Sequence, residues 1–453
     1  MKKQKTIFIT SFYGLIGRNL LATDILPTIF KNQPDVKIVV LLPEEKQKRY
    51  HELFGSERIT VEGTSPIPET SFDLFIAKLF FFLAPTESSR IARDAVREQG
   101  GVFKNIVFGA LGQLGRFKFI RQFTRRFAYI FSAKSRYKKY FDQYQPDLVF
   151  ITDIFRHQDV DVAREARSRG ILTIGMVRSW DNISTKGLNH FITDKVIVQA
   201  DKMKEDIIKY GDVKSENIFI VGVPHYDRYV KDKRMSREDF FRSFNLDSNK
   251  KTVVISPPLR HYTMDPIPEV IFNALEPHQN IQVIVRLTLV GKSNIGDLKP
   301  IPGKLAIDAP EAADDFDQAD ITTNDRHLAD ILYHADAVIS HLSTLAIDAV
   351  VFDKPAFFAG FNTKPTPYSK SVRWFFDMDC ARDLIATGAV SLAESVEELT
   401  RQILPYLQNP DLGKPERESL RKKYCYKLDG KSGERLGKVI VGLLNPQSTS
   451  TPK

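Results

Sequence analysis

The sequence predicts an α/β protein made of two Rossmann-like, doubly wound domains that face each other across a cleft. Short apolar segments rich in β-branched residues alternate with helical patterns along most of the 453 residues. These segments are continuously apolar, which is typical of parallel strands covered on both faces. The pattern restarts after a polar, charged stretch at 230–251. Two such domains bind ligands at the carboxyl ends of their strands.

The expected strands follow one another with helical segments between them. They are 6–10, 36–42, 147–152, 171–177, 195–199 and 218–223 in the first domain, and 252–258, 282–287 and 336–340 in the second. We expect the first domain at 1–228 with a basic, aromatic helical insertion at 71–141, a linker at 229–250 and a second, donor-binding domain at 251–431. A C-terminal helix at 432–444 could cross back, and a disordered tail should occupy 445–453.

The amino-acid composition limits the classes of function to be considered. Lys and Arg outnumber Asp and Glu by 65 to 56, a net charge of +9 that suits phosphates or anionic lipid surfaces. Nucleic acid is not an expected partner, because no zinc spacing or RNA-binding signature occurs. Two distant cysteines, Cys380 and Cys425, favour a cytoplasmic protein without structural zinc. The acidic stretch at 308–320 lacks calcium-loop spacing, so we expect neither a metal nor a cofactor.

The segment 338–357, "VISHLSTLAIDAVVFDKPAF", predicts an anion site in the second domain. A strand is followed by His341, Ser343 and Thr344 and then by a helical pattern that contains Asp348. A helix N-terminus and hydroxyl groups favour a diphosphate, while a carboxylate one turn further on could bind sugar hydroxyls. The alternative is that Ser343 or Thr344 only caps the helix.

Two arginines are further candidates for donor binding. Arg260 and Arg286 follow expected strands of the second domain. A guanidinium group can bind phosphate through two parallel hydrogen bonds. Each could instead be the partner of a surface ion pair.

In the first domain, the segment 176–187, "MVRSWDNISTKG", follows a strand and predicts an acceptor site. Trp180 offers a stacking face, Asp181 a general base and Lys186 a cation, with Asn182 beside them. The alternative is a turn formed by Asp181 and Asn182 next to a packed Trp180.

Other polar residues lie where expected strands end. His157 and Asp153 follow the strand at 147–152 and are alternative bases, although Asp153 could equally cap a helix. Gly14 lies in the first strand-to-helix loop, which does not match the dinucleotide fingerprint. That loop could let the acceptor approach the backbone, or it could be a plain tight turn.

The run 325–358, together with "TVVISPPLRH" and "LDGKSGERL", resembles the donor-binding half of GT-B glycosyltransferases. The resemblance is closer to the CDP-glycerol glycerophosphotransferases of wall teichoic acid synthesis and covers about 252–443. Such enzymes carry histidines where this sequence has Asp181 and Thr288.

Because of these two departures, we expect a metal-independent, inverting glycosyltransferase that moves a sugar from a nucleotide diphosphate to a surface-glycan or lipid-linked acceptor. The alternatives are a CDP-glycerol-type polyol phosphotransferase, a nucleotide-sugar 2-epimerase-like enzyme, and a nucleotide-sugar-binding protein with a decayed catalytic site.

The insertion also suggests contact with a membrane. Residues 115–141 interleave Lys and Arg with Phe and Tyr and contain no acid, and 72–85 is strongly apolar. Such a helix can lie on an anionic bilayer, so we expect peripheral association with the inner face of the plasma membrane. The alternative is a buried apolar helix next to a solvated basic face.

Overall fold

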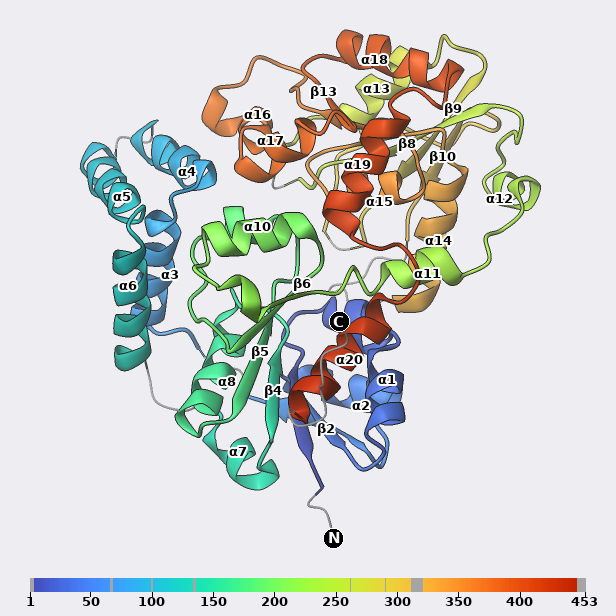
Figure 1. Ribbon diagram of the computed structural model, residues 1–453. Helices are drawn as coiled ribbons and strands as arrows, with labels where there is room; N and C mark the ends of the chain where they lie inside the picture. The colour runs from blue at the N-terminus through green and yellow to red at the C-terminus, as the bar shows by residue number, and fades with distance from the viewer. Residues whose placement is uncertain are drawn as a thin grey trace. The chain divides into compact units, whose positions relative to one another are not determined.

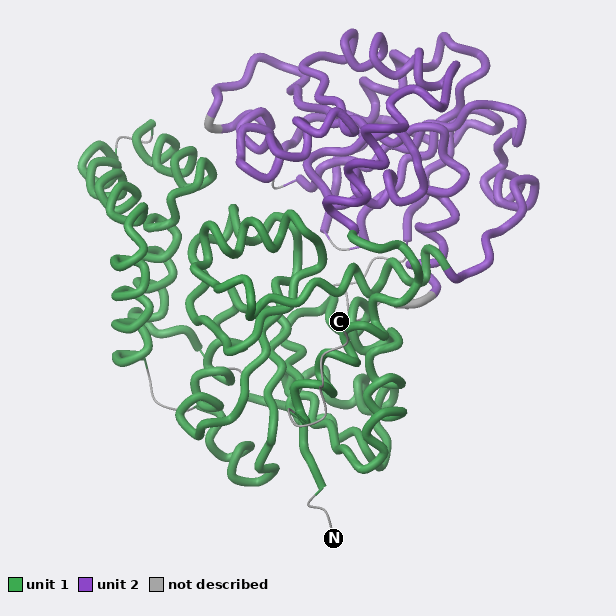
Figure 2. The backbone as a smooth tube through the Cα atoms, in the orientation of Figure 1, with its two compact units in different colours: residues 1–230, 426–453 green, residues 231–425 purple. Residues whose placement is uncertain are grey.

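The computed structural model describes residues 4–65, 68–98, 101–132, 136–260, 262–289, 291–310 and 321–445. The chain forms two compact units, residues 1–230 with 426–453 (unit 1) and residues 231–425 (unit 2) (Figure 2). Each contains one parallel sheet with helices around it, which confirms the predicted α/β class. Nearly all of the acidic stretch 308–320 and of the tail 445–453 lies outside the described residues.

Unit 1 contains a seven-stranded sheet in the order β3-β2-β1-β4-β5-β6-β7. Its strands are β1 (Thr6–Thr10), β2 (Lys37–Pro43), β3 (Ile59–Thr64), β4 (Leu148–Ile151), β5 (Leu172–Met176), β6 (Lys195–Val198) and β7 (Ile218–Ile220). Every pairing is parallel, and β1 lies between β2 and β4 with Ile7 opposite both Ile38 and Leu148. The edge strand β3 was not predicted, because Glu62 and Gly63 interrupt its apolar pattern.

Helices cover this sheet. They are α1 (Ile25–Asn32), α2 (Gln47–Phe54), α8 (His157–Ser168), α9 (Asn182–Thr185), α10 (Asp201–Lys209), α11 (Tyr226–Lys231) and the C-terminal α20 (Ser432–Leu444). The core joins strand residues such as Ile7 and Ile38 to Leu436 and Ile440 of α20, all of them fully buried. The end of the chain is therefore part of the core of unit 1.

The start of α20 is held by a carboxylate. Asp227 accepts hydrogen bonds from the backbone N–H groups of Ser432 at 2.9 Å and Gly433 at 2.8 Å. A negative charge at a helix N-terminus satisfies unpaired amides and complements the helix dipole. Further along, α20 lies beside α1 (Figure 1), and a Cβ added to Gly437 would come within 2.8 Å of the Thr28 side chain.

Most of the insertion forms a layer of helices at one side of unit 1 (Figure 1). The helices of this layer are α3 (Ser71–Leu83), α4 (Glu87–Glu98), α5 (Val102–Leu114) and α6 (Lys118–Phe131). Helix α7 (Lys138–Tyr144) lies apart from the layer, and its Phe141 packs against Phe8 of β1. A capping box of Thr70 and Asp73 begins α3. The layer has its own small core, which includes Ile76, Phe80 and Ala128.

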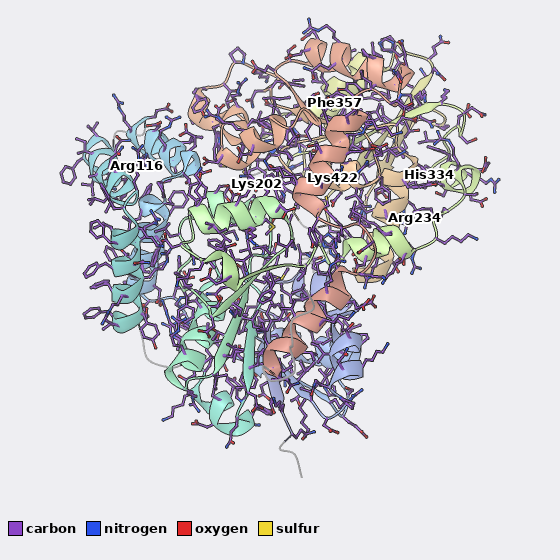
Figure 3. The ribbon with its side chains drawn as sticks, viewed as in Figure 1. Arg116, Lys202, Arg234, His334, Phe357 and Lys422 are labelled. Carbon is purple, nitrogen blue, oxygen red and sulfur yellow. The ribbon has the colours of Figure 1, made fainter. Side chains whose placement is uncertain are left out.

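Unit 2 contains a six-stranded parallel sheet in the order β10-β9-β8-β11-β12-β13. The strands are β8 (Lys251–Ser256), β9 (Ile281–Arg286), β10 (Leu305–Asp308), β11 (Ala337–Ser340), β12 (Ala356–Ala359) and β13 (Val390–Ala393). The helices are α12 (Arg237–Ser243), α13 (Ile267–Leu275), α14 (Ile321–His334), α15 (Leu345–Val351), α16 (Arg373–Phe376), α17 (Asp379–Ile385), α18 (Val396–Gln408) and α19 (Lys414–Cys425). Phe357 of β12 is 1% exposed within this core (Figure 3). Helix α12 falls in the stretch expected to be a linker.

The close approach of α20 and α1 gives a first prediction. Gly437→Ala should lower the free energy of unfolding by about 1–3 kcal/mol, because the added methyl group overpacks against Thr28. Gly109→Ala is the matched control, since nothing lies within 4 Å of a Cβ at this α5 position. That variant should be neutral or gain about 0.5–1 kcal/mol from helix propensity. Denaturant unfolding followed by circular dichroism measures both, and equal behaviour of the two variants would contradict the packing described.

Candidate functional site

The parallel sheet of unit 1 gathers three loops at one edge. Because β1 pairs with β4 and β4 pairs with β5, the residues that follow these strands lie at neighbouring carboxyl ends. In open α/β sheets this edge is where ligands bind. Polar and charged side chains from all three loops meet there.

Four residues from these loops form an edge cluster, which we define as Tyr13, Asp153, Arg156 and Arg178. Arg178 Nε donates to Asp153 Oδ2 at 3.1 Å, and its guanidinium carbon lies 3.8 Å from the centre of the Tyr13 ring. The Arg156 guanidinium lies over the same ring at 5.6 Å. Burial alone would lower the pKa of Arg178, but Asp153, Tyr13 and Asp181 together outweigh this effect and raise that pKa.

Asp181 and Lys186 interact electrostatically with charged residues of the edge cluster. Desolvation lowers the pKa of Lys186, the carboxylates of Asp153 and Asp181 oppose this change, and the charges of Arg178 and Arg156 reinforce it. Lys186 is nevertheless an exposed residue, so solvent can reach it. Asp181 precedes α9, and its Oδ1 accepts a hydrogen bond from Ser179 Oγ at 2.5 Å.

The remaining acceptor-side residues lie close by in sequence and are mostly enclosed. Trp180 is 9% exposed and Asn182 is 1% exposed, so little of the indole face is open for stacking. The Asn182 Nδ2 group has no hydrogen-bond partner among the described residues. Gly14 is buried in the loop after β1, next to Tyr13.

His157 is held in a network of charges that connects α8 to the helical insertion. Its Nε2 lies 2.9 Å from an Arg136 nitrogen, 3.2 Å from Asp161 Oδ2 and 3.5 Å from Asp73 Oδ2. Burial opposes ionisation of Asp73, but hydrogen bonds from Thr70 and Arg136 lower its pKa overall. His157 is therefore held by charged side chains within unit 1, and the sequence did not predict these contacts.

A buried carboxyl group lies beneath the edge cluster. Asp159 is fully buried, and its Oδ1 accepts hydrogen bonds from the hydroxyl of Thr10 and from the backbone N–H of Thr152 at 3.2 Å. Desolvation, followed by repulsion from Asp153, raises the pKa of Asp159 to about 7. Sequence reasoning missed this residue, because it lies inside a helical segment with ordinary amphipathic character.

The loop after β11 contains the predicted donor residues of unit 2. His341 is 6% exposed and stacks on Tyr262 at 5.7 Å, and burial lowers its pKa to about 4, so the imidazole is neutral at pH 7. Its Nε2 has no hydrogen-bond partner among the described residues. Ser343 Oγ accepts from the Leu345 N–H at 3.2 Å, which is a capping contact. Thr344 is exposed at the start of α15 and makes no capping bond through its side chain.

Asp348, the carboxylate predicted to bind sugar hydroxyls, has a largely buried side chain. It is 7% exposed, and its charge helps raise the pKa of the Cys425 thiol at the end of α19, after desolvation as the main cause. Asp348 therefore lies close to the packing of α15 against α19.

The two predicted arginines differ in their surroundings. Arg286 is 6% exposed and donates to Asp308 and, at 2.6 Å, to Asn324 Oδ1. Its charge is therefore already neutralised within the sheet. Arg260 is exposed, and its only side-chain bond among the described residues is from Nε to the Ser293 carbonyl at 3.3 Å. Of the two, Arg260 is the one with a guanidinium open to solvent.

Sequence reasoning missed a groove at the carboxyl ends of β12 and β13. It has a volume of about 370 Å³ and is lined by residues 360–366 with Ser371, Arg373 and Glu394. Asp265 fixes its wall, because it accepts hydrogen bonds from Asn362 Nδ2 at 2.9 Å and Thr363 N at 2.8 Å. Since β12 pairs with β11, the groove neighbours the loop that carries Ser343 and Thr344. The signal in the sequence was the polar segment "GFNTKPT" directly after a buried strand.

Over the described part of the chain, no group of three or more His, Cys, Asp or Glu is arranged to hold a metal ion. None of the helices in those ranges is both long and apolar enough to cross a bilayer.

Comparison with solved structures defines the class of fold as GT-B-like. UDP-GlcNAc 2-epimerase from Neisseria meningitidis, solved with UDP-GlcNAc, is 10% identical with a TM-score of 0.54, over 97% of this chain and 99% of that one. The wall teichoic acid polymerase TagF, in its H548A variant, is 11% identical with a TM-score of 0.51, over 99% of this chain and 90% of that one. At such identities the likeness concerns the fold alone. No curated protein sequence matches the chain.

The family is shown by the sequence itself. The model of the CDP-glycerol:poly(glycerophosphate) glycerophosphotransferase family matches residues 177–442, more than half of the chain. The chain therefore belongs to this family, as its resemblance indicated. The match begins just before Arg178 and includes Asp181, Lys186 and the loop after β11.

The buried Asp159 gives a prediction about pH. Its folded-state pKa of about 7 exceeds the ordinary value of 3.8, so the folded state binds the proton more tightly than the unfolded state does. Its contribution to stability is therefore present below about pH 4 and is lost as the pH rises through 7. Asp159→Asn removes this ionisation, so its stability relative to the natural protein should rise by about 3 kcal/mol between pH 5 and pH 8.

Urea unfolding at pH 5 and pH 8 measures this difference. Asp201→Asn, at an exposed position on α10, serves as the control and should show no such pH dependence. If Asp159→Asn and the natural protein lose stability in parallel between these pH values, the buried carboxyl is not the titrating group.

Proposed function

We propose that this chain is a phosphotransferase that moves a polyol phosphate from a CDP-glycerol-type donor to a hydroxyl group of a cell-envelope polymer. The observation that carries the proposal is the family match over residues 177–442. That match supports the polyol-phosphate alternative better than the expected transfer of a sugar. The family assignment makes the protein a transferase, and the donor and acceptor are part of the proposal.

The bonds that change differ between the two reactions. In polyol-phosphate transfer, the acceptor oxygen bonds to the distal phosphorus, the bond from that phosphorus to the bridging oxygen breaks, and CMP leaves with the bridging oxygen. In sugar transfer a carbon–oxygen bond breaks instead and a nucleoside diphosphate leaves. We assign Asp181 as the base that takes the acceptor proton, because it precedes α9 at the carboxyl end of β5 and is partly exposed.

The donor is assigned to the carboxyl edge of β11, β12 and β13. Thr344 is exposed there, and the neighbouring groove contains Lys364 and the fixed amide of Asn362. Basic side chains and backbone amides stabilise the charge that grows on a leaving phosphate. Arg260 is the second cation assigned to this role, since Arg286 is paired with Asp308.

The nucleotide product tests the proposal. Purified protein is incubated with a polymer acceptor and, separately, CDP-glycerol and a panel of UDP-, GDP- and dTDP-sugars. We expect CDP-glycerol to be consumed with release of CMP. Asp181→Asn should lower turnover by about 10²-fold or more and leave donor binding unchanged. Release of a nucleoside diphosphate from a sugar nucleotide would overturn the proposal, and an active Asp181→Asn variant would remove Asp181 as the base.

We further propose that unit 1 binds the inner face of an anionic membrane through α5 and α6, where a lipid-linked polymer is accessible. Helix α6 buries two arginines and exposes two phenylalanines. Arg121 and Arg125 are buried and bind Asp212, with Arg125 Nη1 at 2.6 Å from Asp212 Oδ2, whereas Phe119 and Phe123 are 65% and 68% exposed. Water disfavours such a surface, and a bilayer interface favours it.

The surrounding charges select anionic lipid. Residues 101–141 contain no Asp or Glu. Lys104, Arg116, Lys118 and Arg126 are exposed on or between α5 and α6, and Arg116 is labelled in Figure 3. Each cation near an anionic surface contributes about 1 kcal/mol to binding.

Vesicle sedimentation tests this part of the proposal. Phe119→Ser with Phe123→Ser should weaken binding to phosphatidylglycerol vesicles at least tenfold, because two exposed aromatic rings no longer enter the interface. Met264→Ser with Leu412→Ser removes exposed apolar side chains from unit 2 and should leave binding unchanged. Equal binding of both double variants, or binding that ignores lipid charge, would contradict the membrane assignment.

A further inference from the structure

We propose that Arg125 of α6 is a positioning residue that connects the membrane-binding helices to the segment 181–190, so that binding to a membrane fixes the position of Asp181. This inference concerns the regulation of the candidate acceptor side and rests on the proposed function. It is based on the contacts that three helices of the insertion make with this segment.

The two sides of α6 have different environments. Arg121 and Arg125 are four residues apart and buried, whereas Phe119 and Phe123, also four apart, are exposed. With 3.6 residues per turn, residues four apart lie on one side of a helix and residues two apart lie on nearly opposite sides. The helix that is assigned to the bilayer therefore has its two buried arginines on the side away from the lipid.

Arg125 holds the chain just after α9. Its Nε donates to the Asn189 carbonyl at 3.0 Å and its Nη2 to Asn189 Oδ1 at 2.9 Å. Its third nitrogen, Nη1, donates to Asp212 Oδ2 at 2.6 Å. Three contacts on one planar guanidinium group restrict its orientation, so a displacement of α6 displaces Asn189 as well.

Asp212 strengthens this connection with a buried negative charge. Its side chain is 2% exposed, and it also accepts a hydrogen bond from Arg121 Nε at 2.9 Å. Burial opposes ionisation of Asp212, but hydrogen bonds from Arg121 and Arg125 lower its pKa overall. The three side chains are therefore charged and paired at pH 7. Lipid over the exposed side of α6 excludes water from their surroundings, which strengthens their attraction.

Helices α3 and α4 contact the same segment. The Leu188 N–H donates to the Phe80 carbonyl at 3.1 Å, and the His190 ring stacks on the Phe80 ring at 4.7 Å. Gly187 has a φ of +83°, and a Cβ added there would lie 2.6 Å from the Cα of Phe81. Helix α4 contacts α9 itself. Three helices of the insertion therefore contact the segment that contains the assigned base.

The order of α9 depends on these contacts. It is a one-turn helix, Asn182–Thr185, with Asp181 and Lys186 at its two ends. A helix of one turn has little stability of its own, so tertiary contacts determine whether it forms. A bilayer that immobilises α6 therefore holds Asp181 and Lys186 in the arrangement that the structure shows.

Hydrogen–deuterium exchange of the full chain, with and without phosphatidylglycerol vesicles, tests this inference. We expect the backbone amides of 182–191 to exchange about fivefold more slowly when vesicles are bound. Arg125→Lys keeps the charge beside Asp212 but loses the two-point contact with Asn189, so it should bind vesicles normally and show no slowing. Asn189→Ala removes one of the two contacts and should show a smaller slowing than the natural protein.

The matched control is Arg93→Lys. It makes the same substitution at a half-buried arginine of α4, whose side chain donates to Ser89 within that helix. The slowing at 182–191 should remain in this variant. Its loss there would contradict a specific role for Arg125.

Turnover with a soluble acceptor provides the second measurement. Vesicles should raise the kcat of the natural protein about threefold or more and leave the KM for the donor unchanged, because the donor lies on the other unit. Arg125→Lys should abolish this rise while it still binds vesicles. A role of Arg125 in overall stability alone would not change the ratio of the two kcat values.

Unchanged exchange at 182–191 in vesicle-bound natural protein would overturn the inference, as would slowing that persists in both Arg125→Lys and Asn189→Ala. Failure of the natural protein to bind vesicles would overturn it together with the membrane assignment. The exchange measurement contains no nucleotide, so its outcome is independent of the donor assay. If exchange slows as expected while CDP-glycerol yields no CMP, the proposed donor fails and the connection through Arg125 stands.

Discussion

Parallel pairing of β1, β4 and β5 is the constraint on which the candidate site of unit 1 depends. This order brings loops from three distant parts of the sequence to one edge of one sheet. The pairing is held by a core in which Ile7, Ile38 and Leu148 are fully buried. Without that register, Tyr13, Asp153 and Arg178 would have no reason to meet. The apolar strands therefore determine where the charged chemistry can occur.

The same unit uses buried charge in two different ways. Asp212, in the loop after α10, forms ion pairs with both Arg121 and Arg125 on the inner side of α6, while Phe119 and Phe123 are exposed. The exposed side of α5 and α6 combines phenylalanine with cations, and residues 101–141 contain no Asp or Glu. At the sheet edge, by contrast, Arg178 and Asp153 are paired with each other, and Asp159 lies fully buried beneath them.

Much of the fold could be predicted from the sequence, because continuous apolar runs mark buried parallel strands. Strand β1 was predicted with the bounds that the structure shows, and β11 was predicted at its end, Ser340. The edge strand β3 and the short strand β13 lack such runs, since their inner residues are only partly buried. Asp181 and Lys186 could be chosen because polar residues followed a strand. Arg178, in the same segment, could not, because its role depends on Tyr13 and Asp153.

Two predicted site residues, His157 on the acceptor side and Arg286 on the donor side, show what a local sequence pattern does not reveal. His157 follows a strand, yet Arg136, Asp73 and Asp161 surround it, and none of these contacts is local except the one within α8. Arg286 ends a strand but is paired across the sheet with Asp308. The sequence pattern predicted that each residue lies at the carboxyl end of a strand. Tertiary contacts, which that pattern does not show, determine whether the side chain is open to a ligand.

The central claim is that the distal phosphorus of the donor moves to the acceptor. The most direct measurement follows a CDP-glycerol labelled at that phosphorus after incubation with the enzyme and a polymer acceptor. The account predicts that the label enters the polymer as a phosphodiester, and that the released nucleotide is unlabelled. Label that remains in a nucleoside diphosphate, with an unlabelled polymer product, would contradict it.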